Sequence, residues 1–291
     1  MPDRTRLTTV IGTYPHTAPL KSGAIISDRV ALDFVEFNPV WDGFKFMVRE
    51  QRFDLCEMAV VTYLLAKAHG KPLALLPAAM IGRFQHPYAI YNAEHGTLRP
   101  QDLGGKRVGI RSFTTTTGAW IRGILANDYG VDLDSIRWIT FEDPHVAEYK
   151  DTTERAPPGK AIVPMLLAGE IDAALGETSS DPRAKSLFGD PKAEAARWYA
   201  KHKVVPINHL MAMRATDVTT DPETARAAYR LLLDGKRAAA VPVDGHDALP
   251  FGIAANAPAL ELIAEYVYQQ RLLPHRFTID EMFAETRHLV T

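Results

Sequence analysis

Strand-like and helix-like segments alternate along almost the whole chain, and this alternation constrains the fold more than any other feature. Segments such as Ala31–Phe37 alternate apolar and polar side chains, whereas Thr117–Tyr129 carries apolar residues at helical spacing. Strands and helices that follow one another in this way form mainly parallel sheets covered by helices. The sequence therefore predicts an α/β protein.

The expected elements can be placed in order along the chain. The strands we expect are Leu7–Ile11, Ala31–Phe37, Phe53–Met58, Lys71–Met80, Pro87–Asn92, the turn and strand Asp102–Ile110, Ile136–Phe141, Ile171–Leu175 and Val204–Arg214. The helices are Asp42–Gln51, Ala59–His69, Thr117–Tyr129, Ile162–Ala168, Pro191–Lys203, Pro222–Ala239, Pro258–Gln270 and Ile279–Thr286. Residues 142–160 are polar and contain prolines, which predicts a surface loop.

Composition and charge narrow the classes of partner. Apolar residues make up 46% of the chain and charged residues 23%, as in ordinary globular proteins. The net charge of −2 gives no basic footprint, so we expect neither nucleic acid nor an anionic membrane as a partner. The single cysteine, Cys56, excludes an intrachain disulfide and a cysteine-based zinc site.

Targeting segments are the next class to consider. No stretch approaches the about 20 apolar residues that cross a bilayer. The first residues contain arginines but no apolar run of the kind found in a signal peptide, which predicts a cytoplasmic protein. No pair of histidines has metal-ligand spacing, so no dedicated metal site is expected.

Two segments resemble landmarks of bilobed substrate-binding proteins. Asp102–Ile110 (DLGGKRVGI) resembles the turn and strand that open their second lobe, and Leu167–Ala174 (LAGEIDAA) resembles a later step from helix into strand. The resemblance implies a two-lobed, periplasmic-binding-protein-like (type II) fold with a ligand cleft between the lobes. We expect residues 1–90 and 215–291 in lobe 1, residues 91–214 in lobe 2, and crossing segments near 91–93 and 209–214.

A narrower resemblance concerns four short motifs. They are Phe53–Met58 (FDLCEM), Arg83–His86 (RFQH), Gly118–Leu125 (GAWIRGIL) and Pro206–His209 (PINH), and in this order they resemble signatures of the 4,5-dihydroxyphthalate decarboxylase family. Residues 250–252 (PFG) are similar to a later family step. The resemblance implies a cofactor-independent decarboxylase of a hydroxylated aromatic carboxylate, such as 4,5-dihydroxyphthalate to protocatechuate. The chain departs from the family in the run SFTTTT at residues 112–117 and in a shorter segment between residues 141 and 162.

The motif residues suggest roles in binding an anionic aromatic substrate and moving a proton. Arg83 could hold a carboxylate with its two-pronged guanidinium, and His86 could exchange a proton near neutral pH. Glu57 ends a strand, where open α/β sheets bind ligands, although a carboxylate there could simply favour a helix start. His209 lies where the chain should return to lobe 1, and could face the ligand or join the lobes. Cys56 is expected to be a small buried residue rather than a nucleophile.

The hydroxyl-rich run and an arginine beyond it complete the candidate set. Hydroxyls and amides of Thr114, Thr115, Thr116 and Thr117 could hold an anionic group at the helix start, although one hydroxyl that caps the helix would explain the run equally well. Arg122 lies a turn into that helix and is either a second carboxylate clamp or a solvated arginine.

The remaining histidines, His16, His145, His246 and His275, are expected to take no part in chemistry. A metal assembled in space by His86, His209 and Glu57 is left open by the sequence.

The leading hypothesis is therefore a carboxy-lyase that uses no cofactor. Arg83 and Arg122 would bind carboxylates, His86 would protonate the ring, and Glu57 or His209 would bind the phenol. The alternative is a non-catalytic substrate-binding protein or sensor for a small anionic ligand, because binding and catalysis use the same cleft. Another lyase on the same scaffold, like menaquinone-pathway enzymes, is a third hypothesis. The sequence leaves the oligomeric state open, a homo-oligomer included.

Overall fold

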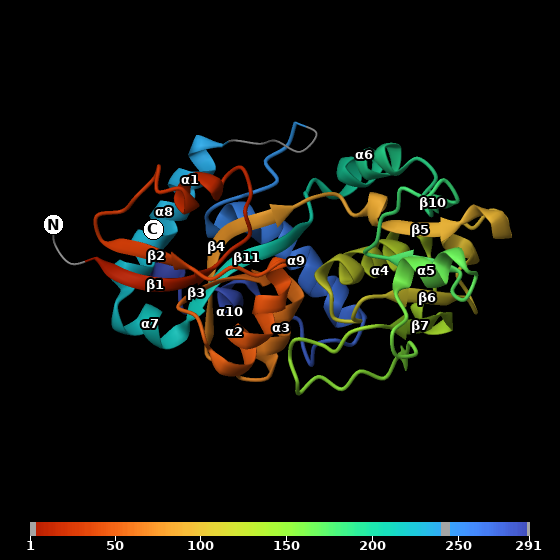
Figure 1. The fold of residues 1–291 in the computed structure, drawn as a ribbon, viewed down its shortest axis with the longest axis horizontal. Coiled ribbons are helices and arrows are strands. Elements are labelled where there is room, and N and C mark those ends of the chain that lie inside the picture. The colour runs from red at the N-terminus through yellow and green to blue at the C-terminus, as the bar shows by residue number, and fades with distance from the viewer. Residues whose placement is uncertain (1–3, 240–244, 290–291) are drawn as a thin grey trace.

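The computed structural model describes residues 4–239 and 245–289, and they form two β-sheets with helices packed around each (Figure 1). The predicted α/β class is confirmed. We refer to the elements around the first sheet as lobe 1, at the left of Figure 1, and to those around the second sheet as lobe 2, at the right.

The first sheet has the strand order β2-β1-β3-β11-β4. Its first three strands are parallel, and β11 runs antiparallel between β3 and β4. The strands are β1 (Thr5–Val10), β2 (Val30–Phe34), β3 (Leu55–Ala59), β4 (Leu73–Gly82) and β11 (Ile207–Arg214). Because β11 is antiparallel to β3, the amino end of β11 lies beside the carboxyl end of β3, with His209 opposite Ala59.

The second sheet has the order β10-β5-β9-β6-β7-β8. Strands β9, β6, β7 and β8 are parallel neighbours, and β5 and β10 add an antiparallel edge. The strands are β5 (Ala89–Asn92), β6 (Arg107–Ile110), β7 (Arg137–Thr140), β8 (Glu154–Arg155), β9 (Ala173–Leu175) and β10 (Ala184–Ser186). The two short strands β8 and β10 lie in segments for which the sequence predicts no strand.

Helices bury the apolar faces of both sheets. Around the first sheet lie α1 (Ala18–Lys21), α2 (Phe44–Glu50), α3 (Val60–Ala68), α7 (Ala215–Thr220), α8 (Pro222–Ala238), α9 (Ile253–Gln269) and α10 (Ile279–Met282). Around the second lie α4 (Thr116–Tyr129), α5 (Ile162–Leu167) and α6 (Pro191–His202). One apolar cluster continues from lobe 1 into lobe 2, where α9 packs against α4 (Figure 1).

The chain passes between the sheets at two neighbouring places. It leaves the first sheet after Gly82 and enters the second at Ala89, and it returns between His202 and Ile207. The two passages lie side by side, since the amide of Arg83 donates to the carbonyl of Pro206 at 2.9 Å. β11 is a strand of the first sheet and therefore belongs to lobe 1 as defined here, although it falls within residues 91–214, the range predicted for lobe 2. The division into residues 1–90 and 215–291 for lobe 1 and 91–214 for lobe 2 remains a prediction.

One predicted helix start differs from the structure. The sequence places it at Pro258, but α9 begins at Ile253, after Gly252 with φ of 93°. Asn256 precedes the predicted start at Pro258, but it lies inside the first turn of α9 and is not the N-cap residue. It donates instead to the carbonyls of Gly252 (2.7 Å), Pro250 (3.1 Å) and Pro77 (3.2 Å), which fastens the first turn of α9 to β4.

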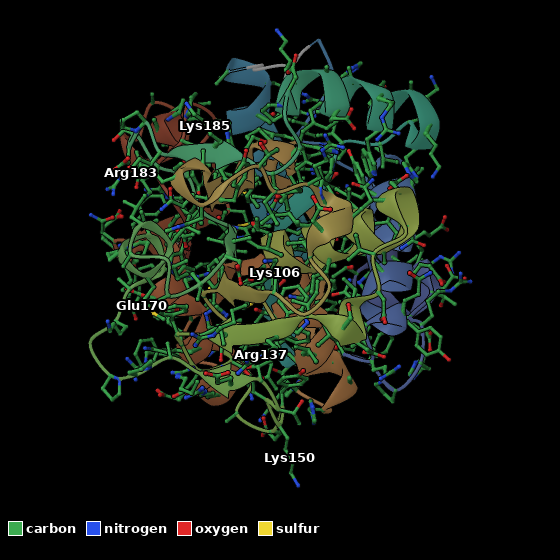
Figure 2. The ribbon with its side chains drawn as sticks, turned by 90° about the vertical axis from the view of Figure 1, so that its right-hand side faces the viewer. Lys106, Arg137, Lys150, Glu170, Arg183 and Lys185 are labelled. Atoms are coloured by element: carbon green, nitrogen blue, oxygen red, sulfur yellow. The ribbon has the colours of Figure 1, made fainter. Side chains whose placement is uncertain are left out.

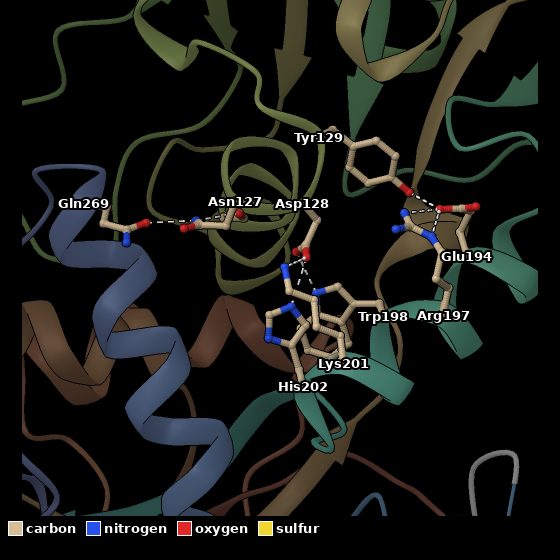
Figure 3. A network of polar contacts seen from close by, with 10 residues as sticks. Asn127, Asp128, Tyr129, Glu194, Arg197, Trp198, Lys201, His202 and Gln269 are labelled. Atoms are coloured by element: carbon tan, nitrogen blue, oxygen red, sulfur yellow. Dashed lines mark hydrogen bonds and ion pairs between the residues drawn. The ribbon is translucent and has the colours of Figure 1, made fainter.

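A polar network holds α6 against α4 in lobe 2 (Figure 3). The buried carboxylate of Asp128 accepts from Trp198 Nε1 at 3.0 Å, Lys201 Nζ at 2.6 Å and His202 Nε2 at 3.0 Å. The hydrogen bonds from Lys201 and His202 lower the pKa of Asp128, although burial alone would raise it. The network therefore keeps an anion buried beside apolar rings, and it fixes the position of α6.

The outer end of lobe 2 carries charges of both signs (Figure 2). Among the labelled side chains, four form ion pairs: Lys106 with Asp172, Arg137 with Glu154, Glu170 with Lys160, and Arg183 with Asp181. Such exposed pairs contribute little to stability.

Candidate functional site

A cavity of about 40 Å³ lies between the lobes. Its walls in lobe 1 are Trp41, Phe44, Ala59, Thr62, Asn208 and His209. Its walls in lobe 2 are Arg111, Ser112, residues 114–117, Glu142 and His145. The carboxyl ends of the parallel strands β3, β6 and β7 all lead into this region, which is where open α/β sheets bind ligands.

Glu57 and His209 form a hydrogen-bonded pair at the lobe 1 side. Glu57 is fully buried in β3 and accepts from His209 Nδ1 at 2.6 Å, Tyr14 Oη at 2.8 Å and the amide of Gly12 at 2.8 Å. A carboxylate at Nδ1 fixes the hydrogen on that nitrogen, so Nε2 is the nitrogen of His209 able to exchange a proton with a ligand. Sequence reasoning named both residues, and the structure brings them together.

Tyr14 is a site residue that sequence reasoning missed. Burial, followed by the nearby Glu57 carboxylate, raises the pKa of Tyr14 well above its ordinary value, so its hydroxyl stays protonated and donates to Glu57. Only the pairing of β1 with β3 brings Tyr14 near Glu57, and no local pattern in the sequence reports that contact.

The hydroxyl-rich run lines the opposite wall, at the start of α4. Thr116 Oγ1 accepts from the amide of Val61 in lobe 1 at 3.0 Å, and Thr117 Oγ1 accepts from Asn208 Nδ2 at 2.9 Å. The N-cap residue is Thr115, and its side chain makes no capping hydrogen bond. The run is therefore not explained by helix capping; it lines the cavity and joins the lobes.

Arg111 is the cation of this wall, and sequence reasoning missed it as well. It directly follows β6, and its guanidinium lies over the ring of Trp41 at 4.7 Å and 3.4 Å from the carboxylate of Glu142. Its position directly after a predicted strand could have identified Arg111 as a candidate, because open α/β sheets bind ligands at the carboxyl ends of their strands.

Arg83 lies one layer behind the cavity wall. Its Nη2 donates to Thr117 Oγ1 at 3.3 Å, and its guanidinium stacks on Tyr88 at 3.9 Å. Arg83 is thus joined to a wall residue without lining the cavity itself.

His86 does not line this cavity. It is fully buried in lobe 2, with its ring at the edges of Phe188 (4.9 Å) and Trp198 (6.3 Å), and neither ring nitrogen has a partner among the described residues. Burial lowers the pKa of His86 to about 4, so the ring is neutral near pH 7. Its predicted role as proton donor stays a prediction, without support from its position.

Arg122 is also outside the cavity wall. It is fully buried, so it is not a solvated arginine, and its Nε donates to Gln270 Oε1 at 2.8 Å. Its Nη2 donates at 2.7 Å to the carbonyl of Phe113, whose ring it also stacks on. Arg122 therefore fastens the main chain of the hydroxyl-rich run. Its predicted role as a second carboxylate clamp stays a prediction.

His145, for which the sequence predicts no role in chemistry, lies in the cavity wall. Its Nδ1 is hydrogen-bonded with Thr62 Oγ1 at 3.0 Å. Burial, followed by the positive charges of Arg111 and His209, lowers the pKa of His145 to about 3. The ring is therefore an uncharged polar group.

Neither a metal-binding cluster nor a membrane-spanning helix occurs among the described residues. In residues 4–239 and 245–289, no cluster of three or more His, Cys, Asp or Glu side chains could hold a metal ion. No helix in those ranges combines the length and apolar character that spanning a membrane requires. Cys56 is buried, and burial raises the pKa of its thiol, which keeps it in the unreactive form.

Comparison with known proteins finds two similar decarboxylases. The chain is 28% identical to a 4,5-dihydroxyphthalate decarboxylase of Comamonas testosteroni, over 98% of this chain and 89% of that protein. It is 26% identical to one of Pseudomonas putida, over 68% of this chain and 82% of that protein. No family model matches the chain. The resemblance predicted from the four motifs is confirmed.

Solved structures share the fold at low sequence identity. The alkanesulfonate-binding protein SsuA from Xanthomonas axonopodis pv. citri, bound to MOPS, has a TM-score of 0.57 and 14% identity, over 97% of this chain and 98% of that one. The aliphatic sulphonate-binding protein SsuA from Escherichia coli has a TM-score of 0.59 and 11% identity, with the same coverage. The desulfurization enzyme DszB has a TM-score of 0.52 and 14% identity, over 97% and 96%. The predicted two-lobed, periplasmic-binding-protein-like fold is confirmed, and the same fold serves binding proteins and an enzyme.

Proposed function

We propose that this chain, a distant relative of 4,5-dihydroxyphthalate decarboxylases with the fold of periplasmic substrate-binding proteins, decarboxylates a hydroxylated aromatic carboxylate. The observation that carries the proposal is the pair of Glu57 and His209, which faces the Arg111 wall across a cavity between the lobes. A proton-transfer group thus stands opposite an anion-binding wall, as the reaction requires.

The lobe 2 wall would bind the substrate as an anion. Arg111 supplies a fixed positive charge, and the first residues of α4 line the cavity, where the positive end of a helix dipole favours an anion. The hydroxyls of residues 114–117 add donors. Arg83 supports this wall through its hydrogen bond to Thr117.

The lobe 1 wall would deliver the proton. His209 Nε2–H protonates the ring carbon that bears the carboxylate, helped by electron density from a ring hydroxyl. The bond from that carbon to the carboxylate then breaks, its electron pair returns to the ring, and CO₂ leaves. Glu57 holds His209 by Nδ1 throughout and stabilises its charged form, in the way a carboxylate orients a general acid–base histidine.

His86 and Arg122 have no step in this proposal. His86 is enclosed by aromatic side chains of lobe 2, and Arg122 is committed to Phe113 and Gln270. Both predictions can still be tested by substitution, since His86→Ala would lower kcat if His86 were the proton donor. The cytoplasmic location also stays a proposal, and the oligomeric state remains open.

The direct test is to incubate the purified protein with hydroxybenzoates, phthalate and hydroxylated phthalates, and to measure CO₂ release. Release from a hydroxylated member, and none from phthalate, is expected because only the former can push electron density toward the carboxylate carbon. A protein that binds members of the panel but releases no CO₂ from any of them would instead be a binding protein or sensor, a role that proteins of the same fold also have.

A further inference from the structure

A segment of lobe 2 reaches across and lies on lobe 1. We call residues 142–151, between β7 and β8, the strap; Figure 1 shows this yellow-green segment running from β7 toward α3. Arg49 of α2 donates to the strap carbonyls of Pro144 and His145, at 2.8 Å each. Lys71, after α3, pairs with Glu148 at 2.5 Å. These contacts hold the strap against lobe 1 from outside the cavity.

The strap places His145 in the cavity wall with a fixed ring orientation. Thr62 Oγ1 is hydrogen-bonded to its Nδ1 at 3.0 Å. The ring packs edge to face with Phe44, with 5.8 Å between the two ring centroids. Phe44 also packs edge to face with the ring of His209, with 5.2 Å between the ring centroids. The two imidazoles therefore contact the same phenylalanine, and among the described residues no hydrogen bond involves His145 Nε2.

The two histidines differ in what they offer a ligand. His209 is paired with a carboxylate, whereas His145 has a hydroxyl partner and positive neighbours, so it remains neutral. A neutral imidazole can donate or accept one hydrogen bond but cannot neutralise an anion. It is thus suited to an uncharged hydroxyl and ill suited to a second carboxylate.

We propose that His145 binds a ring hydroxyl of the substrate through Nε2, and thereby selects hydroxylated aromatic acids over their unhydroxylated counterparts. The inference rests on the proposed function for the class of substrate. A polar group that is held in a cavity wall loses its water when a ligand covers it, so a ligand without the hydroxyl leaves it unpaired. Selectivity should therefore depend on His145.

The experiment measures binding by calorimetry for 4,5-dihydroxyphthalate and for phthalate, in a His209→Gln background that suppresses turnover. The parent should prefer the dihydroxy compound. His145→Phe, which keeps a ring edge against Phe44, should reduce this preference by about 10-fold, because the dihydroxy compound loses a hydrogen bond and phthalate no longer leaves a polar group unpaired. His145→Gln keeps an amide donor and acceptor, and should retain part of the preference.

A strap variant outside the cavity provides the matched control. Lys71→Met removes the pair with Glu148, and should weaken both ligands by the same factor. Equal losses for both ligands in His145→Phe and His145→Gln, or a preference left unchanged in both, would overturn the proposal. If the wild type releases no CO₂ but the preference falls as expected, the decarboxylase proposal fails while the role of His145 stands.

Discussion

At the scale of single residues, buried polar groups separate into those that serve the cavity and those that serve the core. Glu57 accepts three hydrogen bonds around one carboxylate, one of them from the histidine that lines the cavity. His86 has no partner for either ring nitrogen among the described residues and contacts aromatic rings. Both residues belong to the four motifs on which the family resemblance was based, so those motifs contain a residue beside the cavity and one enclosed in the core.

His86 should make the protein less stable as the pH falls. Its folded-state pKa is about 4, against 6.5 for the unfolded chain, so the unfolded state binds more protons between these values and stability is lost as pH drops through that window. Between pH 7.5 and pH 5 the wild type should lose about 2 kcal/mol more free energy of unfolding than His86→Leu. Urea unfolding at both pH values measures this. Equal losses in the two proteins would show that His86 is not held neutral.

Tyr14→Phe tests how Glu57 is held. Removing the hydroxyl leaves the buried carboxylate with His209 and Gly12 as partners, so we expect a loss of about 1–3 kcal/mol in unfolding free energy. Turnover should fall with little change in KM, because Tyr14 does not line the cavity. Unfolding curves together with steady-state kinetics provide the measurement, and unaltered stability and turnover would contradict the assignment.

At the scale of elements, the start of α4 shows which cavity residues the sequence predicts and which it does not. The hydroxyl-rich run at the start of α4 was predicted either to hold an anionic group or to cap the helix, and residues 114–117 do line the cavity. Arg111 lies one residue before that run and was missed, because strand ends are not sharply marked in a sequence. His145 was beyond prediction, since its place depends on contacts of the strap with Arg49 and Lys71, far away in the chain.

Arg122→Met tests whether Arg122 fastens the hydroxyl-rich run. The change leaves the carbonyl of Phe113 and the side chain of Gln270 without their donor, and we expect a loss of about 1–3 kcal/mol in unfolding free energy. Arg276→Met, which removes only an exposed pair with Glu265, is the control and should cost less than about 0.5 kcal/mol. Binding of phthalate should weaken in Arg122→Met alone. Similar effects of both substitutions in thermal or urea unfolding would contradict this role.

At the scale of the whole molecule, the cavity between the lobes is small. Its volume of about 40 Å³ is far below the ~300–1,000 Å³ of typical ligand pockets, so we expect the lobes to move apart when an aromatic acid enters. The passages between the sheets lie side by side at Arg83 and Pro206, which is a suitable place for such a hinge. The strap contacts of Arg49 and Lys71 favour the closed arrangement.

Arg49→Met should therefore weaken ligand binding without touching the cavity. It removes both hydrogen bonds to the strap, so we expect phthalate to dissociate about 10-fold faster and to associate at least as fast as with the wild type. Lys45→Met on the same helix, whose ammonium lies over Phe46, is the control and should behave as the wild type. Stopped-flow kinetics measure both rates. A slower association with unchanged dissociation would contradict the closing role.

We propose that this binding-protein fold supports decarboxylation through the pair of Glu57 and His209. The test is CO₂ release from 4,5-dihydroxyphthalate by the wild type and by His209→Gln, alongside calorimetric binding of the same compound to His209→Gln. We expect turnover by the wild type, a fall in kcat of about 10²–10⁴-fold in His209→Gln, and binding that persists in the variant. Wild-type binding without CO₂ release, or turnover undiminished in His209→Gln, would contradict it.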